Sequence, residues 1–178
     1  ILRDLQSYDS PIYANLKAGG YRLPTESEWE YACRAGTATA FHSGPITYTE
    51  EEDPLDPNLD SVGWYVENSE DTTHPVGQKN PNAWGLYDMH GNVAEWCWDF
   101  VGSYPLRGSQ FEPAVNPRRD GAEYSPQDWI LRRIWRGGMW SSEPALCRSP
   151  ARNGSIYSGV QHWRNIGFRP VVTAQGWN

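Results

Sequence analysis

The sequence predicts a small α+β domain in which irregular loops outweigh helices and strands. Its 178 residues include 17 Gly and 14 Pro, scattered along the chain as turn residues rather than gathered in one linker. Ten Trp and ten Tyr stand beside only four Phe, and these side chains bury a large area while keeping an N–H or O–H group that needs a partner. One clear helix start and a few short strand patterns complete the picture. The length suits a single domain, and the composition excludes a helix bundle.

Charge and hydropathy exclude two classes of partner. The chain has 22 acidic and 15 basic side chains, a net charge of −7, whereas phosphate binding depends on clustered Lys and Arg. We therefore expect no nucleic-acid partner. No run of 18 apolar residues occurs, so we expect no membrane span. The chain begins at Ile1 without a signal-peptide pattern, which favours a processed or truncated product. The compartment stays open, and we favour an extracytoplasmic one.

The first regular element is a helix predicted over residues 25–35. Thr25 is placed to cap its N-terminus, and Glu28 follows at the spacing of a capping box. Trp29 begins an apolar stripe with helical spacing. Gly36 is expected to end the helix.

Short strands and long loops are expected after this helix. Pro, Asn, Asp and Gly recur every few residues over 37–82 and 102–130, which predicts loops there. Loops of that length fit a folded domain only when they are tied down. The segments with strand character are 85–89 (a strand or a turn), 91–100 (a tight turn followed by a strand), 133–136 (a strand running into Gly137 and Gly138), 147–152 and 166–172.

The three cysteines are Cys33, Cys97 and Cys147, and no CxxC pair occurs. A zinc ribbon or a thioredoxin-type motif is therefore unsupported. One disulfide with a free thiol is compatible with the sequence, and so are three buried reduced thiols. We favour the second arrangement slightly, because free Cys behaves as a small buried hydrophobe.

Four blocks of sequence, in order, are 21–32, 82–96, 136–140 and 165–169. They resemble the formylglycine-generating enzyme family, also called the sulfatase-modifying-factor domain. The resemblance implies a C-type-lectin-like fold with a small twisted antiparallel sheet, about two helices and extensive irregular loops. It implies one domain over 1–178 that lacks the family's N-terminal portion. The chain is then either a fragment, or another chain supplies the missing N-terminal strands.

The resemblance leaves three classes of function open. The family includes copper-dependent oxidases that convert a sulfatase cysteine to formylglycine, iron-dependent sulfur-transfer enzymes, and non-catalytic binding proteins such as the variable proteins of diversity-generating retroelements. The oxidases need two cysteines about five residues apart after the Gly-Gly pair, because paired soft thiolates suit Cu⁺. Only Cys147 lies in that segment, and we interpret it as a buried structural thiol. The four His residues show neither HxxxH nor HxE spacing, and His90 is expected to be hydrogen-bonded or at the surface.

Calcium is the expected cofactor. Asp88 and Glu95 flank a Gly91-Asn92 turn, and Ca²⁺ accepts hard oxygen donors from irregular backbone. The resemblance implies a structural calcium site at Asp88, Gly91, Val93 and Glu95, where Gly91 and Val93 contribute their carbonyls. A second site would map to Asn58 and Leu59, completed by Asn68 or Glu70. The alternative for the first site is a turn of surface residues that bind water.

The expected function is non-catalytic binding of a protein or surface ligand through the segment 139–164. Residues 155–164 mix Tyr, Trp, Ser, Gly and His, which is typical of a paratope, although an ordinary exposed loop would look the same. The expected contacts are Trp140, Ser142, Glu143, Ile156, Tyr157, Ser158, Val160, His162 and Trp163. One alternative is a formylglycine-generating oxidase with Cu⁺ at Cys147, and a second is a structural subunit of a larger complex.

Overall fold

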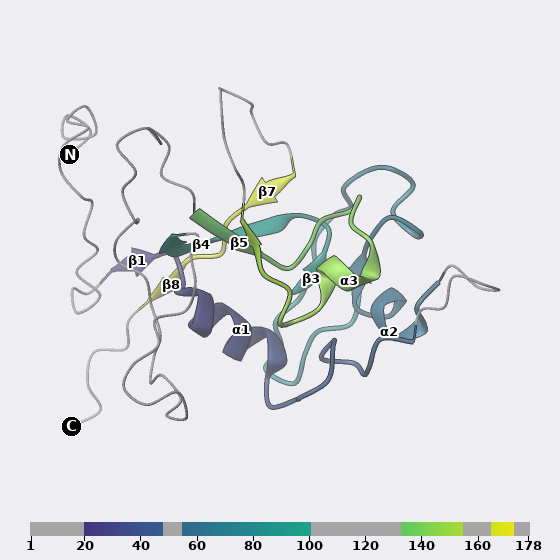
Figure 1. Cartoon of the computed structure of the whole chain (residues 1–178), viewed down its shortest axis with the longest axis horizontal. Coiled ribbons are helices and arrows are strands. Elements are labelled where there is room, and N and C mark those ends of the chain that lie inside the picture. The colour runs from purple at the N-terminus through teal and green to yellow at the C-terminus, as the bar shows by residue number, and fades with distance from the viewer. Residues whose placement is uncertain (1–19, 48–54, 101–132, 155–164, 173–178) are drawn as a thin grey trace.

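A four-stranded sheet lies at the centre of the protein (Figure 1). The computed structural model describes residues 20–47, 55–100, 133–154 and 165–172. In spatial order the sheet consists of β6 (Asn153–Gly154), β5 (Arg133–Arg136), β4 (Ala94–Phe100) and β7 (Ile166–Gly167). β5 pairs antiparallel with β4 and with β6, whereas β7 runs parallel to β4. The sheet is therefore mainly antiparallel, as expected, with one parallel strand at its edge.

Two short strand pairs accompany this sheet. β1 (Tyr21–Arg22) and β8 (Val171–Val172) pair antiparallel and bring the two ends of the described chain together (Figure 1). β2 (Gly63–Trp64) and β3 (His90–Gly91) pair in parallel. Gly91 has a φ of 72°, and a Cβ there would lie 2.0 Å from the Trp64 carbonyl oxygen. This close approach of two backbones explains why glycine occupies the position.

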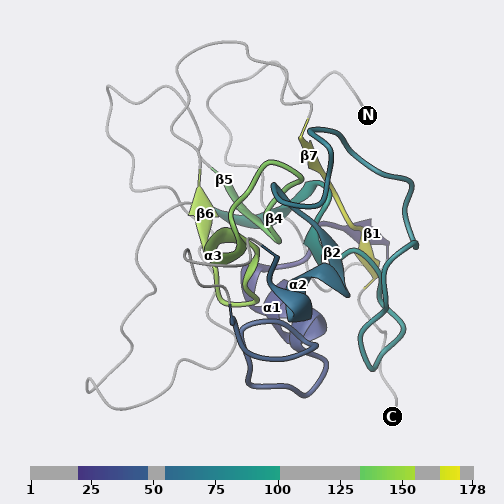
Figure 2. The same cartoon turned by 90° about the vertical axis from the view of Figure 1, so that its right-hand side faces the viewer.

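Helix α1 (Glu26–Arg34) packs against one face of the central sheet (Figures 1 and 2). The predicted capping box is confirmed: the Glu28 N–H donates to Thr25 Oγ1 at 3.2 Å, and the Thr25 N–H donates to Glu28 Oε2 at 2.8 Å. The helix ends at Ala35 in the left-handed conformation, one residue before Gly36. Two four-residue helices, α2 (Pro57–Asp60) and α3 (Pro144–Cys147), lie together on the side of the molecule away from β1 and β8 (Figure 1).

The strand predictions hold at 91–100 and 133–136 but fail at 147–152. Cys147 ends helix α3, and a turn follows in which the Ala151 N–H donates to the Arg148 carbonyl at 2.9 Å. Pro144 starts this helix, and Pro150 has no N–H to offer a strand partner. A turn lies at 82–85, where the Gly85 N–H donates to the Asn82 carbonyl at 2.9 Å, and residues 86–89 are irregular backbone. The predicted loop at 102–130 falls outside the described residues. No described helix is long and apolar enough to span a membrane.

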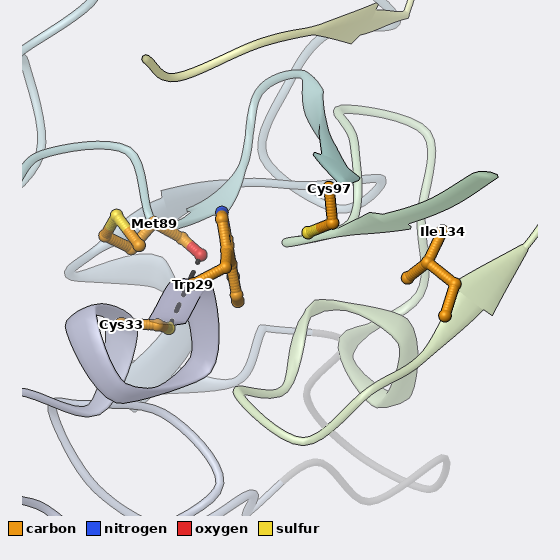
Figure 3. Close-up of a cluster of buried hydrophobic side chains, with 5 residues drawn as sticks. All are labelled: Trp29, Cys33, Met89, Cys97 and Ile134. Atoms are coloured by element: carbon orange, nitrogen blue, oxygen red, sulfur yellow. Dashed lines mark hydrogen bonds between the residues drawn. The ribbon is translucent and has the colours of Figure 1, made fainter. Parts of the chain in front are cut away.

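Two clusters of buried side chains form the core. One fills the space between α1 and the sheet and is drawn in Figure 3. It comprises Trp29, Cys33, Met89, Cys97 and Ile134. The other joins α2 and α3 and comprises Phe41, Leu59, Val62, Tyr65 and Cys147. All three thiols are buried and none forms a disulfide, which is the arrangement we favoured.

A buried network of charges fastens α1 to the sheet. Arg136 on β5 lies 3.0 Å from Glu26 and 2.8 Å from Glu30, both on α1. The backbone N–H of Glu26 donates to Asp99 on β4 at 2.6 Å. Arg152 adds a second cation 2.6 Å from Glu26. These pairings compensate the cost of removing the Arg136 and Glu26 charges from water.

Candidate functional site

The described start of the segment 139–164 is held firmly by hydrogen bonds. The Trp140 backbone N–H donates to the Asn92 carbonyl at 2.9 Å, and its indole Nε1 donates to Asn165 Oδ1 at 3.1 Å. Ser142 is buried, and its hydroxyl accepts from the Met139 N–H at 3.1 Å. Ser142 therefore shapes the turn rather than facing a ligand. Both residues belong to a preorganised base of the predicted binding segment.

Glu143 is the exposed member of this base. It occupies the N-cap position of α3 without a side-chain capping bond, so its carboxylate is available at the surface. The remaining predicted contact residues lie outside the described residues. They are Ile156, Tyr157, Ser158, Val160, His162 and Trp163.

Cys147 sits in a closed apolar environment. Its residue exposure is 0%, and a Cβ on Gly138 would lie 2.6 Å from its Sγ. Burial raises the pKa of this thiol to about 12, and the charge of Glu67 acts in the same direction. At neutral pH the group is therefore a thiol, whereas metal binding and nucleophilic attack need the thiolate.

Glu67 is a residue that the sequence analysis missed. Its Oε2 is buried without a hydrogen-bond partner. Burial raises the pKa of this carboxyl, and the charge of Glu143 raises it further. The two carboxylates thus influence each other beside the start of α3. The sequence around a buried Glu in a loop looks the same as the sequence around an exposed Glu, so no sequence signal could have found Glu67.

His90 is hydrogen-bonded and fully buried. Its Nε2 accepts from the His42 backbone N–H at 3.2 Å, so its Nδ1 carries the proton and donates to the Cys147 carbonyl at 2.7 Å. Burial lowers the pKa of His90 to about 3, so the ring is neutral. Its Nε2 lies 3.7 Å from Cys33 Sγ, whose pKa burial raises to about 12. This neutral pair is a structural contact and not an activated thiolate.

The turn at 88–95 contains an unsatisfied oxygen where calcium was predicted. Asp88, with a φ of 56°, accepts the Gly77 N–H on Oδ2 at 2.8 Å, while its Oδ1 is buried without a partner. Gly91 lies in this turn, and Val93 lies directly before β4. The Glu95 carboxylate already accepts from Trp29 Nε1 at 2.7 Å and pairs with Arg169 at 2.8 Å. Asp88 Oδ1 is therefore the donor that fits a cation best, because a buried carboxylate oxygen needs a positive or N–H partner.

The second predicted calcium site has no comparable feature. Asn68 Oδ1 accepts the Tyr65 N–H at 2.8 Å, and the Asn58 side chain donates to a neighbouring carbonyl. Leu59 is buried in the core, and Glu70 is exposed. These contacts give calcium no support at this position, and the second site stays a prediction. Across the described segments, the two predicted calcium sites included, no group of three His, Cys, Asp or Glu side chains gathers as a metal cluster.

The comparison with protein families decides where this chain belongs. The family model described as the sulfatase-modifying factor enzyme 1-like domain matches residues 4–174. The chain belongs to this family. Its α+β architecture, with three helices and short sheets among the described residues, is the C-type-lectin-like fold that the four sequence blocks implied.

Individual relatives include enzymes and a variable protein. The formylglycine-generating enzyme of Mycobacterium tuberculosis is 37% identical over 180 aligned positions, which cover 92% of this chain and 54% of the enzyme. Treponema denticola variable protein 1 superposes with a TM-score of 0.62 at 36% identity, over 88% of this chain and 49% of that one. PvdO from Pseudomonas aeruginosa gives a TM-score of 0.58 at 30% identity, over 85% and 52%. This chain thus spans about half the length of these relatives.

Proposed function

We propose that this chain is a non-catalytic binding domain of the sulfatase-modifying-factor family, which recognises a protein or surface ligand through the segment 139–164. The observation that carries the proposal is the state of Cys147. It is the one cysteine of that segment, it is closed off by Gly138 and the second core cluster, and burial raises its pKa to about 12. A single thiol in this environment does not match the paired thiolates that Cu⁺ chemistry needs.

The geometry at the base of the segment supports a binding role. Trp140 and Ser142 are fixed to the core by the hydrogen bonds described above, and Glu143 points outward from this base. A preorganised base lowers the entropy cost of presenting the residues that follow it. The likeness to Treponema denticola variable protein 1 is compatible with such a role, and with membership of the retroelement-diversified proteins.

Calcium is part of the proposal as a structural ion. Asp88 Oδ1 and the backbone carbonyls of Gly91 and Val93 would hold it, and the carboxylate of Glu95 would be shared between the ion, Arg169 and Trp29. Calcium supplies positive charge that orders this turn, and it takes no part in chemistry. The turn matters to the binding segment because the Asn92 carbonyl accepts the Trp140 N–H at 2.9 Å.

A copper titration tests the non-catalytic half of the proposal. The full chain and Cys147→Ser are titrated with Cu⁺ against a chromogenic chelator, and each is incubated in air with a peptide that contains a sulfatase-type cysteine. We expect the two proteins to retain equal amounts of copper and to form no aldehyde. Stoichiometric Cu⁺ binding that disappears in Cys147→Ser, or aldehyde in the peptide, would contradict the proposal and support the oxidase alternative.

A peptide selection tests the binding half. A phage-displayed random peptide library is selected on the immobilised chain, and the selected peptides are measured against a Tyr157→Ala, Trp163→Ala double variant. We expect the double variant to lose binding and Tyr31→Ala to keep it, since Tyr31 is an exposed aromatic on α1 outside the segment. Peptides that bind all three proteins equally would contradict the assignment of the segment.

A further inference from the structure

Asn92 joins three other segments of the chain at the turn before β4. Its backbone N–H donates to the Trp64 carbonyl on β2 at 2.7 Å, and its carbonyl accepts the Trp140 N–H at 2.9 Å. In the side chain, Oδ1 accepts the His74 N–H at 3.0 Å, and Nδ2 donates to the His74 carbonyl at 3.0 Å. Asn92 therefore uses both backbone groups and both side-chain groups to bind residues that are not its neighbours in the sequence.

Burial and backbone conformation leave Asn92 little freedom. The residue is only 2% exposed, so a polar group that lost its partner there would not recover one from water. Its φ of 60° lies in the left-handed region, which Asn and Gly adopt more readily than most residues. Because the N–H and the side chain are both bound to other segments, rotation about the backbone of Asn92 is restricted. The Asn92 carbonyl is thereby held in the direction of the Trp140 N–H.

The His74 backbone that Asn92 binds has anchors of its own. The His74 ring stacks on the Trp64 indole, with 3.8 Å between ring centres and 12° between the planes. Its Nε2 donates to the Ser69 carbonyl at 2.8 Å. Lys79 Nζ lies 4.0 Å from the centre of the same indole. The side chain of Asn92 is therefore tied to a backbone whose position is fixed by further contacts.

Trp140 depends on the Asn92 carbonyl for its backbone position. It lies in a turn at 139–142. Another bond joins this turn to a separate segment, from the Val66 N–H to the Ser142 carbonyl, and at 3.2 Å it is longer than the Asn92 bond. Trp140 is partly exposed, so a shift of its backbone would change what its ring presents at the surface.

We propose that Asn92 is a positioning residue of the binding segment, and that its side-chain amide sets the affinity for a ligand through Trp140. The amide itself touches no ligand. It holds the Asn92 carbonyl against the Trp140 N–H and so keeps the Trp140 ring in the orientation in which a ligand meets it. Preorganisation of this kind reduces the entropy cost of binding. The inference rests on the proposed function, because it requires that Trp140 contacts the ligand.

Amide exchange and peptide binding test the proposal on the full chain. Asn92→Gly removes the side-chain amide and keeps a residue that tolerates the left-handed backbone. Exchange of the Trp140 N–H is measured relative to the Trp98 N–H, which bonds to the Pro24 carbonyl at 2.8 Å, because a loss of global stability changes both rates alike. We expect this ratio to rise about tenfold, and the peptides selected from the phage library to bind about tenfold more weakly, which is the effect of losing about one hydrogen bond.

Matched variants separate positioning from stability. Asn82→Gly also removes a buried amide, but the hydrogen bonds of that amide go to α1 and to its own loop. It should lower the free energy of unfolding and leave the exchange ratio and the peptide affinity unchanged. Asn92→Asp keeps the acceptor for the His74 N–H and loses the donor, so both effects should appear in it in the same direction. In the Trp140→Ala background, Asn92→Gly should cause no further loss of affinity, because the ring that it positions is absent.

Three results would overturn the inference. One is an exchange ratio or a peptide affinity that Asn92→Gly leaves unchanged. Another is an equal loss of affinity in Asn82→Gly, which would assign the effect to stability alone. The third is a loss that Asn92→Gly adds in full to that of Trp140→Ala, which would mean that the amide acts without the ring.

The inference and the proposed function can fail separately. Peptides that need Tyr157 and Trp163 but bind Asn92→Gly as tightly as the unaltered chain would keep the proposed function and overturn the inference. Peptides that need Asn92 and Trp140 but not Tyr157 and Trp163 would support the inference and remove 155–164 from the binding site.

Discussion

The two faces of the central sheet carry similar residues in opposite states. On the α1 face, Trp29 Nε1 finds Glu95 at 2.7 Å, and Arg136 lies between two carboxylates. On the opposite face, Trp135 Nε1 and Asn153 Nδ2 find no acceptor. The indole on one face thus has a charged acceptor within this chain, and the indole on the other face has none. The two faces therefore differ in how their buried indole N–H groups are paired, and variants on each face measure what that difference contributes to stability.

The largest change in stability is expected when the buried cation of the α1 face, Arg136, is removed. Arg136→Met removes one of the two cations beside buried Glu26, and Arg152 remains, so we expect a loss of about 3 kcal/mol in the free energy of unfolding. The matched control is Arg148→Met, because Arg148 is exposed and makes one local bond to the Ala145 carbonyl. Urea unfolding of both variants measures the difference. Equal losses would mean that the α1 face is not closed as described.

Acid titration tests whether the buried His90 ring is shielded from water. Burial lowers the pKa of His90 from 6.5 to about 3, so between these values the unfolded chain takes up a proton that the folded chain refuses. Stability should therefore fall as the pH drops from 6.5 towards 3. In His90→Gln this contribution disappears, and the pH dependence of urea unfolding should flatten by a few kcal/mol over that range. An unchanged slope would show that the ring is hydrated and titrates normally.

A pair of Trp variants compares the two faces most directly. Trp29→Phe and Trp135→Phe remove the same ring volume, but only Trp29 Nε1 has a charged acceptor. Loss of a hydrogen bond to a charged group costs about 1.5–3 kcal/mol, whereas loss of an unpaired donor is nearly neutral. We expect Trp29→Phe to be less stable than Trp135→Phe by that amount in thermal and urea unfolding. Equal effects would mean that Trp135 Nε1 has a partner after all.

The parts of the fold that the sequence predicted are those with local causes. The capping box at Thr25 and Glu28 and the Gly91-Asn92 turn before β4 act within a few residues, so their spacing is sufficient. Residues 147–152 were predicted to be a strand. The prolines at 144 and 150 instead produce a short helix and a turn.

Features that depend on strand register could not be predicted. Trp135 lies between Trp96 and Asn153 in the central sheet, although those three residues come from separate parts of the sequence. The unpaired Oε2 of Glu67 likewise depends on what packs around it. At the calcium turn the sequence indicated the right carboxylate, Asp88, but not that Glu95 already pairs with Arg169. Burial and pairing depend on residues that are distant in the sequence, so neighbouring residues do not reveal them.

The smallest predicted effect is the stabilisation of the chain by Ca²⁺ bound at the 88–95 turn. Free Asp88 Oδ1 predicts that Ca²⁺ stabilises the chain by about 1.4 kcal/mol at ten times its dissociation constant. Asp88→Asn should abolish this gain while changing the calcium-free protein little, because Asn also tolerates the left-handed backbone. Asp71→Asn is the matched control, since Asp71 has a φ of 57° beside the 56° of Asp88 and is exposed. Thermal unfolding with and without Ca²⁺ should therefore separate the two aspartates, and a calcium response that survives in Asp88→Asn would place the ion elsewhere.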